Sequence, residues 1–591
     1  MKQFAPTLVF ILLGLCAAAA ILTGVANIAF LVQCGATPTG EHPFSGFGFL
    51  LSANTNAFGL APAGCVPDAS GIYMTYLIAA VMIGLLVFGL SMGWLRVRDS
   101  DWYFRLQLLF RDGFARAGEI RKNVSARSLL RRARQLRPAL KKPTPDQLGV
   151  RLGRARGMDV MVSVEDSMVL SAAPRGGKGF RFVISSILDW DGPLITTSTR
   201  NDNLSATYEA RKRMGEVTVV DPQGLSGIKS RKRPALHTGC EDPLIAEMRG
   251  RAMIAGSALG QSATNQEWAG ISAGLLAALL QAAALSGEGT AALRRWTQNP
   301  ALCDPAIAIL KDQGAPGWSQ MLESTVKGDP ELLANSWIGV REAGKPLLIP
   351  GIYDALSPEG DAVLDPREFL EGHNTLYLIG TGSGAGATGG YLAAILDDIV
   401  EQARRKALAS QGGRLDPPLG LILDELANMF VWPALPTVLS DGGGIGIFTQ
   451  VVFQSMSQAA TVWSESEAQT IWNSAIVKVL LGGSTDVRHM QDISNMLGER
   501  KVLHRGRSWS EESTTHSEQR ATAPVLSVDE LRRLPTGMAV LAYKNIRPVL
   551  LDAKGWTKRS DASQIHADRR STELEQLSEF QRQYARRTTD V

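Results

Sequence analysis

The chain has 591 residues, of which 45% are hydrophobic and 20% charged, and its formal net charge is +4. This balance is that of an ordinary globular protein and excludes a largely disordered chain, while the length allows several domains. The small net charge indicates no particular partner, so the positions of the charges carry more information.

Two stretches near the N-terminus, residues 7–32 and 72–94, contain no charged residue. As helices, each is long enough to cross a hydrocarbon core of roughly 30 Å. We therefore expect a membrane anchor over residues 1–98 with two spanning helices. A signal peptide cleaved after Ala17–Ala20 is the alternative for the first stretch, but the apolar run continues to Val32, beyond the roughly 7 to 15 residues of a signal peptide's apolar core.

The charges around these stretches predict the topology. Residues 33–71 contain Glu41 and Asp68 but no Lys or Arg, whereas arginines follow the second stretch at positions 96, 98, 105, 111 and 116. By the positive-inside tendency, we expect a multi-pass protein of the inner or plasma membrane with both termini in the cytoplasm. The loop 33–71 is then extracytoplasmic, where Cys34 and Cys65 could form a disulfide, although their spacing alone leaves this open.

Residues 99–157 form a basic juxtamembrane arm, with clusters at 131–134 (RRAR) and at Lys141 and Lys142. Two functions remain open for it. The arm could fix the topology and also contact anionic lipid, or it could contact the phosphates of a nucleic acid.

From about Val160 the chain alternates short apolar runs with helical stretches. We predict strands near residues 167–170, 193–197, 216–220, 375–379, 419–423, 447–453, 475–481 and 538–542. Continuous apolar runs of this kind favour a parallel sheet that is covered on both faces, so the fold class is α/β. We assign this domain to residues 158–239 and 346–555.

Three segments interrupt that alternation. Residues 240–345 are rich in Ala and Leu, as in 271–285, and are predicted to form an all-α insertion. Residues 506–522 are rich in Ser, Thr and Glu and are expected to form a mobile loop. The last residues, 556–591, are polar and of mixed charge, which indicates a fraying helix or a tail.

Residues 171–180, SAAPRGGKGF, resemble a phosphate-binding loop. In the pattern G-x-x-x-x-G-K-[ST], backbone N–H groups surround the phosphates, the lysine reaches the β- and γ-phosphates, and the hydroxyl ligates magnesium. Here Ala172 replaces the first glycine and Gly179 replaces the hydroxyl residue, so a simple glycine turn is the alternative. The candidate nucleotide-binding residues are Ala173, Pro174, Arg175, Gly176, Gly177, Lys178, Gly179 and Phe180.

Two later strands supply candidate catalytic groups. Residues 419–425, LGLILDE, are an apolar strand that ends in adjacent carboxylates. Asp424 is the candidate magnesium residue, acting through the metal's water shell, and Glu425 the candidate general base. Gln454 ends the next strand and is a candidate sensor of the γ-phosphate or the attacking water.

Residues 384–389, GAGATG, also match the dinucleotide fingerprint G-x-G-x-x-G. The acidic residue expected at the end of a second strand, about 20 positions later, is missing, because Asp397 and Asp398 fall within a helical run. We therefore interpret this stretch as a flexible connector and not as an NAD site.

Together these motifs resemble the type IV secretion coupling proteins, the membrane-anchored ATPases of conjugation. The resemblance rests on an ordered set of motifs over residues 160–553. These are RGGKG at 175–179, STRND at 198–202, VVDP at 219–222, LDE at 423–425, QSMSQ at 454–458, IVKVL at 476–480 and LRRLP at 531–535. Ala173 and Pro174 stand where the family commonly has Pro and Thr, and Arg200 stands where many members have Lys.

The resemblance implies a RecA-like motor that binds ATP and Mg²⁺ and forms a homo-hexamer on the cytoplasmic face. It would bring relaxase-bound DNA, or protein effectors, to a type IV secretion channel. The insertion 240–345 is similar in position to the family's substrate-recognition domain. The turn at 441–446 lacks the basic residue that family members often carry there, so no arginine finger can be named.

Two other functions are alternatives to this one. A double-stranded DNA translocase of the chromosome-segregation type shares the anchor and the motor fold, but usually has a complete phosphate loop and a C-terminal winged helix. The residues after Ala553 are too few for such a domain. A non-catalytic membrane scaffold with a degenerate loop is the third hypothesis.

Overall fold

The structure is a computed structural model that describes residues 4–36, 50, 65, 68–257, 259–260, 262, 264–381, 388–509 and 514–589. The chain forms two compact units, Met1–Leu108 and Leu109–Val591, and each is described by itself. The stretch interpreted as a connector, residues 384–387 in particular, lies outside the described residues, as does most of the loop 33–71.

The first unit is a pair of long apolar helices, α1 (Phe4–Cys34) and α3 (Ala69–Arg98). Ala26, Ala29 and Phe30 of α1 pack against Ile72 and Tyr76 of α3. A disulfide joins Cys34 to Cys65, a pairing that the sequence left open. By length and composition, three helices in the described chain could cross a membrane: residues 16–34 of α1, all of α3, and α11 (Gln266–Leu285). The last belongs to the second unit, where most of its side chains are buried.

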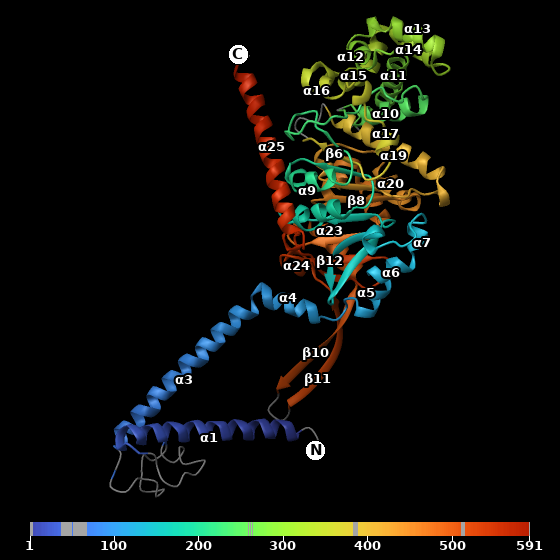
Figure 1. The fold of residues 1–591 in the computed structure, drawn as a ribbon. Coiled ribbons are helices and arrows are strands. Elements are labelled where there is room, and N and C mark those ends of the chain that lie inside the picture. Colours follow the sequence, from blue (N-terminus) through green and yellow to red (C-terminus); the bar gives the residue numbers. More distant parts are fainter. Residues whose placement is uncertain are drawn as a thin grey trace. The chain divides into compact units, whose positions relative to one another are not determined.

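The second unit is built on one eleven-stranded sheet with the order β2-β1-β13-β12-β9-β3-β8-β7-β4-β6-β5 (Figure 1). The strands are β1 (Gly149–Ala155), β2 (Met158–Ser163), β3 (Met168–Ser171), β4 (Leu194–Ser198), β5 (Val217–Val220), β6 (Thr375–Ile379), β7 (Leu419–Asp424), β8 (Ile447–Phe453), β9 (Val477–Leu481), β12 (Met538–Tyr543) and β13 (Val549–Asp552).

All eight predicted strands are present within two residues of their expected limits. The prediction of a parallel sheet holds for only part of it. The seven strands from β9 to β5 are parallel, but β12 pairs antiparallel with β9, and β13, β1 and β2 continue the antiparallel part. Short connections, such as Arg156 and Gly157 between β1 and β2, force antiparallel pairing because a parallel pair needs a long crossover.

The expectation of a loop at residues 506–522 is wrong for the part that the structure describes, and residues 510–513 lie outside that part. The described residues belong to two antiparallel strands, β10 (Glu499–Trp509) and β11 (Thr514–Pro524), whose eleven pairs run from Glu499 with Pro524 to Trp509 with Thr514. These strands are polar and have no apolar face, so the sequence pattern does not indicate them, although Thr favours extended backbone.

The basic arm is also more structured than its composition suggested. It contains α4 (Asp101–Phe110), α5 (Ala117–Asn123), α6 (Ala126–Arg131), α7 (Ala133–Leu136) and strand β1. Leu129 and Leu136 belong to the same hydrophobic core as the strands of the sheet. Arg137 is buried and pairs with Asp416 at 2.5 Å and with Asp191 at 3.2 Å.

The described residues between 240 and 345 form helices and no strand. They are α10 (Pro243–Ala255), α11, α12 (Gly289–Gln298), α13 (Asp304–Gln313), α14 (Trp318–Val326) and α15 (Pro330–Gly344). They gather at one end of the second unit with α16 (Pro350–Ala355) (Figure 1). Buried Arg249 of α10 pairs at 2.8 Å with Asp398 of α19 (Gly389–Leu408), which ties this helical part to the sheet.

The C-terminal residues are not a tail but helix α25 (Ala562–Thr589), which lies along α9 (Asp202–Lys212) (Figure 1). Asp568 of α25 receives two hydrogen bonds from Arg213, and Gln576 bonds to Ser205 and Ser226. Ile565 of α25 packs in an apolar cluster with Ala206 and Trp556, but the other buried side chains among its described residues are polar, so a search for an apolar stripe does not find the packing.

Candidate functional site

The glycine-rich loop lies between the end of β3 and the helix that follows it. Arg175 and Gly177 adopt left-handed backbone conformations, with φ of 61° and 85°, and the amide of Gly176 donates to the carbonyl of Ala173 at 3.0 Å. After Lys178 the chain enters a π-helical turn, η3 (Gly179–Val183), and then α8 (Ile184–Asp189). The loop therefore leads directly into a helix N-terminus, the arrangement that binds phosphate groups.

Strand order explains why distant residues meet here. β8 lies between β3 and β7, and all three are parallel, so the loop after β3 and the carboxylates after β7 lie at the same edge of the sheet. The ammonium of Lys178 lies 3.3 Å from Oδ1 of Asp424 and 3.1 Å from Oε1 of Glu425. Three of the candidate site residues, Lys178, Asp424 and Glu425, thus lie together in the structure.

Asp424 is nearly buried and held on three sides. Besides Lys178, the side-chain amide of Asn203 donates to its Oδ2 at 2.9 Å, and the hydroxyl of Thr197 donates to its backbone carbonyl at 2.8 Å. Burial raises the pKa of Asp424, while Lys178 and Asn203 oppose that rise. A divalent cation beside it would favour the ionised form further.

Glu425 adopts a left-handed conformation with φ of 54°, which turns the chain sharply at the end of β7. The hydroxyl of Thr199 donates to its Oε2. Burial raises the pKa of Glu425, but the bond from Thr199 and the charge of Lys178 outweigh it, so the net shift is downward. The carboxylate is therefore ionised at neutral pH, as a general base must be.

Gln454 directly follows β8, between the strands that carry Lys178 and Asp424. Its backbone amide donates to the side chain of Gln458 at 3.2 Å, and the sensor role of its own side chain stays a prediction. Phe180 lies at the start of η3, and its ring packs edge-on against Trp556 with centroids 6.1 Å apart. This contact joins the loop helix to the C-terminal segment.

The residues present fit a nucleotide with Mg²⁺. The Nζ of Lys178 and the Oδ1 of Asp424 are buried at ion-pair distance from each other, yet neither makes a hydrogen bond of good geometry with a described residue. Nζ of Lys178 is a donor suited to phosphate oxygens, and Oδ1 of Asp424 is an acceptor suited to magnesium or its waters. No cluster of three or more His, Cys, Asp or Glu that could hold a metal occurs among the described residues, so Mg²⁺ would depend on phosphates and water as well as Asp424.

Sequence reasoning missed three supporting residues, Thr197, Thr199 and Asn203. They lie at the end of β4, next to β7, and at the start of α9. The motif at 198–202 is one of those that carry the family resemblance, but it gave no role to any side chain in this region. An asparagine in the first turn of a helix is usually a solvent-facing residue or a cap, so only the buried bond to Asp424 identifies it.

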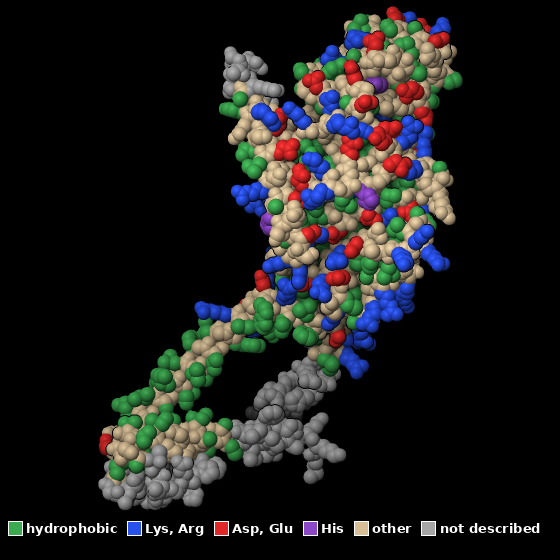
Figure 2. Space-filling view, in the orientation of Figure 1, with side chains coloured by type: hydrophobic (Ala, Val, Ile, Leu, Met, Phe, Trp, Pro, Cys, Tyr) green, Lys and Arg blue, Asp and Glu red, His purple; other side chains and the backbone are tan. Residues whose placement is uncertain are grey.

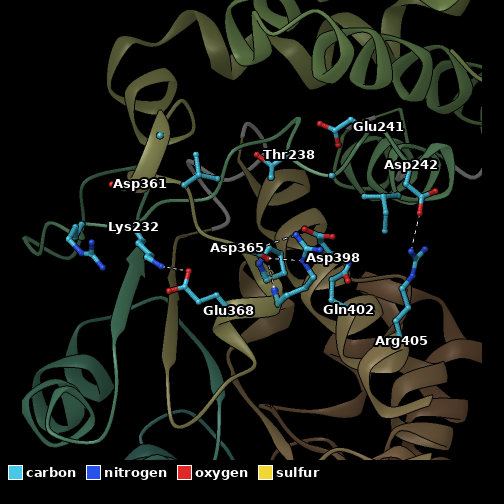
Figure 3. A pocket seen from close by; sticks show the side chains of 17 residues that line it. Lys232, Thr238, Glu241, Asp242, Asp361, Asp365, Glu368, Asp398, Gln402 and Arg405 are labelled. Atoms are coloured by element: carbon cyan, nitrogen blue, oxygen red, sulfur yellow. Dashed lines mark hydrogen bonds and ion pairs between the residues drawn. The ribbon is translucent and has the colours of Figure 1, made fainter. Parts of the chain in front are cut away.

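A separate cavity of about 900 Å³ lies where the helical part joins the sheet. Figure 3 shows its lining, in which Lys232 reaches Glu368 and Arg405 reaches Asp242. These ion pairs measure 2.5 Å and 3.0 Å, and the second connects α19 to the start of α10 in the helical part. The cavity does not include Lys178, Asp424 or Glu425.

Two family models match the sequence. One, described as Type IV secretory system Conjugative DNA transfer, covers residues 118–286. The other, described as TraM recognition site of TraD and TraG, covers residues 418–536. No curated protein matches the sequence significantly.

Solved structures of the bacterial conjugative coupling protein TrwB are similar in fold. The unbound form is 19% identical, with 73% of this chain and 92% of that chain covered and a TM-score of 0.52. The complex with a non-hydrolysable ATP analogue is 20% identical, with coverages of 73% and 92% and a TM-score of 0.52. The complex with ADP and Mg²⁺ is 20% identical, with coverages of 73% and 93% and a TM-score of 0.51.

The fold is therefore that of a RecA-like α/β domain with an all-α part. The two family models match two separate parts of the chain, residues 118–286 and residues 418–536. Together with this fold, the two family models support the resemblance to the type IV secretion coupling proteins that the sequence indicated.

Proposed function

We propose that the protein is a membrane-anchored ATPase that couples a relaxase–DNA complex, or protein effectors, to a type IV secretion channel. The observation that carries the ATPase assignment is the position of the Lys178 ammonium between Asp424 and Glu425 at the end of three adjacent parallel strands. The TrwB complexes with an ATP analogue and with ADP and Mg²⁺ support the same ligands for this chain.

Each residue has a separate role in this proposal. The backbone N–H groups of residues 175–179 and the Lys178 ammonium bind the β- and γ-phosphates. Bound magnesium supplies charge stabilisation on the phosphate oxygens. Asp424, oriented by Asn203, holds the water shell of that ion in place of the hydroxyl that Gly179 lacks. Glu425 accepts a proton from the attacking water, and Gln454 orients that water or the γ-phosphate.

The anchor 1–98 would place the motor on the cytoplasmic side of the membrane, with both termini in the cytoplasm. The disulfide between Cys34 and Cys65 supports this topology, because such bonds persist outside the reducing cytoplasm. A homo-hexamer would let a neighbouring subunit complete the site, since among the described residues no arginine forms an ion pair with Asp424 or Glu425, although the charge of Arg200 acts on Glu425.

Two regions are candidates for partner recognition. The helical insertion 240–345 would contact the relaxase complex, by its similarity in position to the family's substrate-recognition domain. Residues 418–536 match a family model described as the TraM recognition site of TraD and TraG, so a protein similar to TraM is a further candidate partner for that region.

The direct test is ATP hydrolysis by the full chain in lipid nanodiscs, with and without DNA. Lys178→Ala should abolish turnover while membrane insertion is retained, whereas Lys212→Ala, at an exposed site on α9, should leave turnover unchanged. Hydrolysis at the wild-type rate by Lys178→Ala would refute the site. Absence of any activity in the wild type with every DNA tried would favour the scaffold hypothesis.

A further inference from the structure

The basic residues between Ile120 and Asp146 fall into two groups: some form ion pairs with the domain, and the others face solvent. This stretch has nine Lys and Arg residues and no acidic one. Arg132 and Arg137 turn toward the domain, where they pair with Glu165, and with Asp191 and Asp416. These two residues hold the stretch against the domain.

The other cations face solvent. Arg121, Lys122, Arg127, Arg134, Lys141 and Lys142 are exposed and form no ion pair with a residue that the structure describes. Arg131 is also exposed, and it donates only to the backbone carbonyl of Lys122, at 2.8 Å. Figure 2 shows the Lys and Arg side chains gathered over α5, α6 and α7. We call these seven residues the basic face.

An exposed leucine lies within this face. Leu130 is 45% exposed and shares one side of α6 with Arg127 and Arg131, at the spacing of three and four residues that places side chains together. The opposite side of α6 is the packed one, where Ser128 and Leu129 are buried. A rigid helix therefore presents a leucine flanked by arginines.

We propose that the basic face binds the anionic surface of the membrane, with Leu130 entering the boundary between lipid headgroups and acyl chains. Cations beside an apolar side chain suit this boundary, because the charges contact lipid phosphates while the leucine leaves water. The proposal concerns a surface far in sequence from Lys178, Asp424 and Glu425 and does not depend on ATP hydrolysis.

Two observations favour a membrane over a nucleic acid. First, Arg121 follows Arg98, the end of α3, by 23 residues, ten of which form α4, so the linker reaches at most about 60 Å. If α3 spans the membrane, the linker keeps the basic face within about 60 Å of its surface. Second, residues 117–142 contain no aromatic side chain, which removes the stacking contacts that single-stranded nucleic acids use.

The test uses the full chain in nanodiscs of phosphatidylcholine alone or with about one third phosphatidylglycerol, a composition chosen for its negative surface potential. A nitroxide is attached at Leu130→Cys in a Cys16→Ala background, since Cys240 and Cys303 are buried and Cys34 and Cys65 are bonded. Leu408→Cys, at the exposed end of α19, is the matched control. Collision rates with oxygen and with a water-soluble nickel chelate report the depth of each label.

We expect the label at position 130 to be reached mainly by oxygen in anionic discs and mainly by nickel in neutral discs, while the label at 408 stays in water in both. Replacing Arg127, Arg131 and Arg134 by Gln should lower the ratio of membrane-bound to free label by roughly a hundredfold. Lys311→Gln with Arg341→Gln, exposed cations of the helical insertion, should have no such effect.

A fluorescent DNA duplex added to neutral discs tests the competing partner. If the label at 130 stays in water in anionic discs, the proposal is wrong, whatever happens with DNA. If, in addition, the triple arginine variant loses DNA binding, the basic face is a nucleic-acid surface. An oxygen-accessible label that the triple variant returns to water supports the proposal.

Discussion

The side-chain amide of Asn203 donates a 2.9 Å hydrogen bond to Oδ2 of Asp424, while Lys178 lies 3.3 Å from Oδ1 of the same carboxylate. Each oxygen of Asp424 thus has its own neighbour, from the first turn of α9 and from the glycine-rich loop. The carboxylate has little rotational freedom. A fixed carboxylate is what a magnesium site needs when the loop provides no hydroxyl.

Asn203→Ala should therefore weaken magnesium dependence more than nucleotide binding. Residues that orient a metal-binding group typically contribute 10- to 100-fold, so we expect the Mg²⁺ concentration for half-maximal ATP hydrolysis to rise about tenfold or more. Titration of the ATPase rate with Mg²⁺ measures this. Asn473→Ala, at an exposed site on α22 (Glu465–Ser474), is the control, and an unchanged Mg²⁺ titration for Asn203→Ala would exclude the orienting role.

Glu425→Gln should bind ATP normally but hydrolyse it at least about 100-fold more slowly, because the base is lost while the pocket keeps its shape. The lowered pKa of Glu425 adds a pH prediction. The wild-type carboxylate stays ionised to a pH below its ordinary value of 4.5, so kcat should not fall through loss of this base between pH 8 and pH 5. Equilibrium binding of a fluorescent ATP analogue, beside the pH profile of kcat, tests both parts. Loss of nucleotide binding in Glu425→Gln would contradict this division of roles.

Asp397 should make the domain less stable as the pH rises from about 4 to about 6. Burial raises its pKa to about 6 in the folded state, against 3.8 in an unfolded chain, so the folded state binds more protons in this range. The stability that this proton provides is present at acidic pH and is lost above about 6, a difference of up to about 3 kcal/mol.

Asp397→Asn keeps an oxygen to accept the hydrogen bond from Trp432 at 2.5 Å but carries no charge. We expect it to raise the melting temperature of the full chain at pH 7.5 and to change it little near pH 4. Asp312→Asn, an exposed residue of α13, should change neither value. A lower melting temperature for Asp397→Asn at pH 7.5 would show that the charge is stabilised by the surrounding residues.

Arg137→Ala should destabilise the second unit by about 3 kcal/mol, because it leaves Asp416 and Asp191 without their buried partner. Thermal unfolding of the full chain, followed by tryptophan fluorescence, measures the loss. Arg134→Ala is the matched control, since Arg134 is exposed three residues away and makes no ion pair among the described residues. Equal melting temperatures for the two variants would mean that the buried ion pairs of Arg137 do not stabilise the fold.

Gln576→Ala should loosen α25 by removing the bonds at 2.9 Å from Ser205 and at 2.8 Å to the carbonyl of Ser226. The loss of two buried hydrogen bonds is expected to cost about 1 to 3 kcal/mol. Limited proteolysis with detection of the C-terminus would show faster cleavage within α25. Gln581→Ala changes an exposed residue of the same helix and should be cleaved at the wild-type rate.

Eight strands were predicted from their apolar runs, whereas β2 and β13, which are also largely apolar, were missed. β6 and β8 were placed at their observed limits because all of their residues are apolar or buried in a continuous stretch. β1 was missed because exposed arginines interrupt it, and it was assigned to the basic arm. β10 and β11 were missed because they are polar, and the packing of α25 was missed because its described buried side chains, apart from Ile565, are polar.

The residues of the candidate site likewise fall into those that a local sequence pattern marks and those that it does not. Lys178, Asp424 and Glu425 could be found because a loop motif and a strand ending in two acids each mark the end of a parallel strand, and such ends share one edge of a sheet. Asn203 could not be found, because its role depends on how close α9 lies to β7, which no local pattern records. The role of Gln454 remains a prediction for the same reason.

The position of β1 in the sheet has a consequence for the order in which the chain can fold. β1 pairs with β2 on one side and with β13 on the other, and β13 is made near the end of synthesis. The hairpin of β1 and β2 therefore has one unpaired edge until almost all of the chain has left the ribosome. During that interval the apolar helices α1 and α3 are already available for insertion, so this motor would complete its sheet only after it has been delivered to a bilayer.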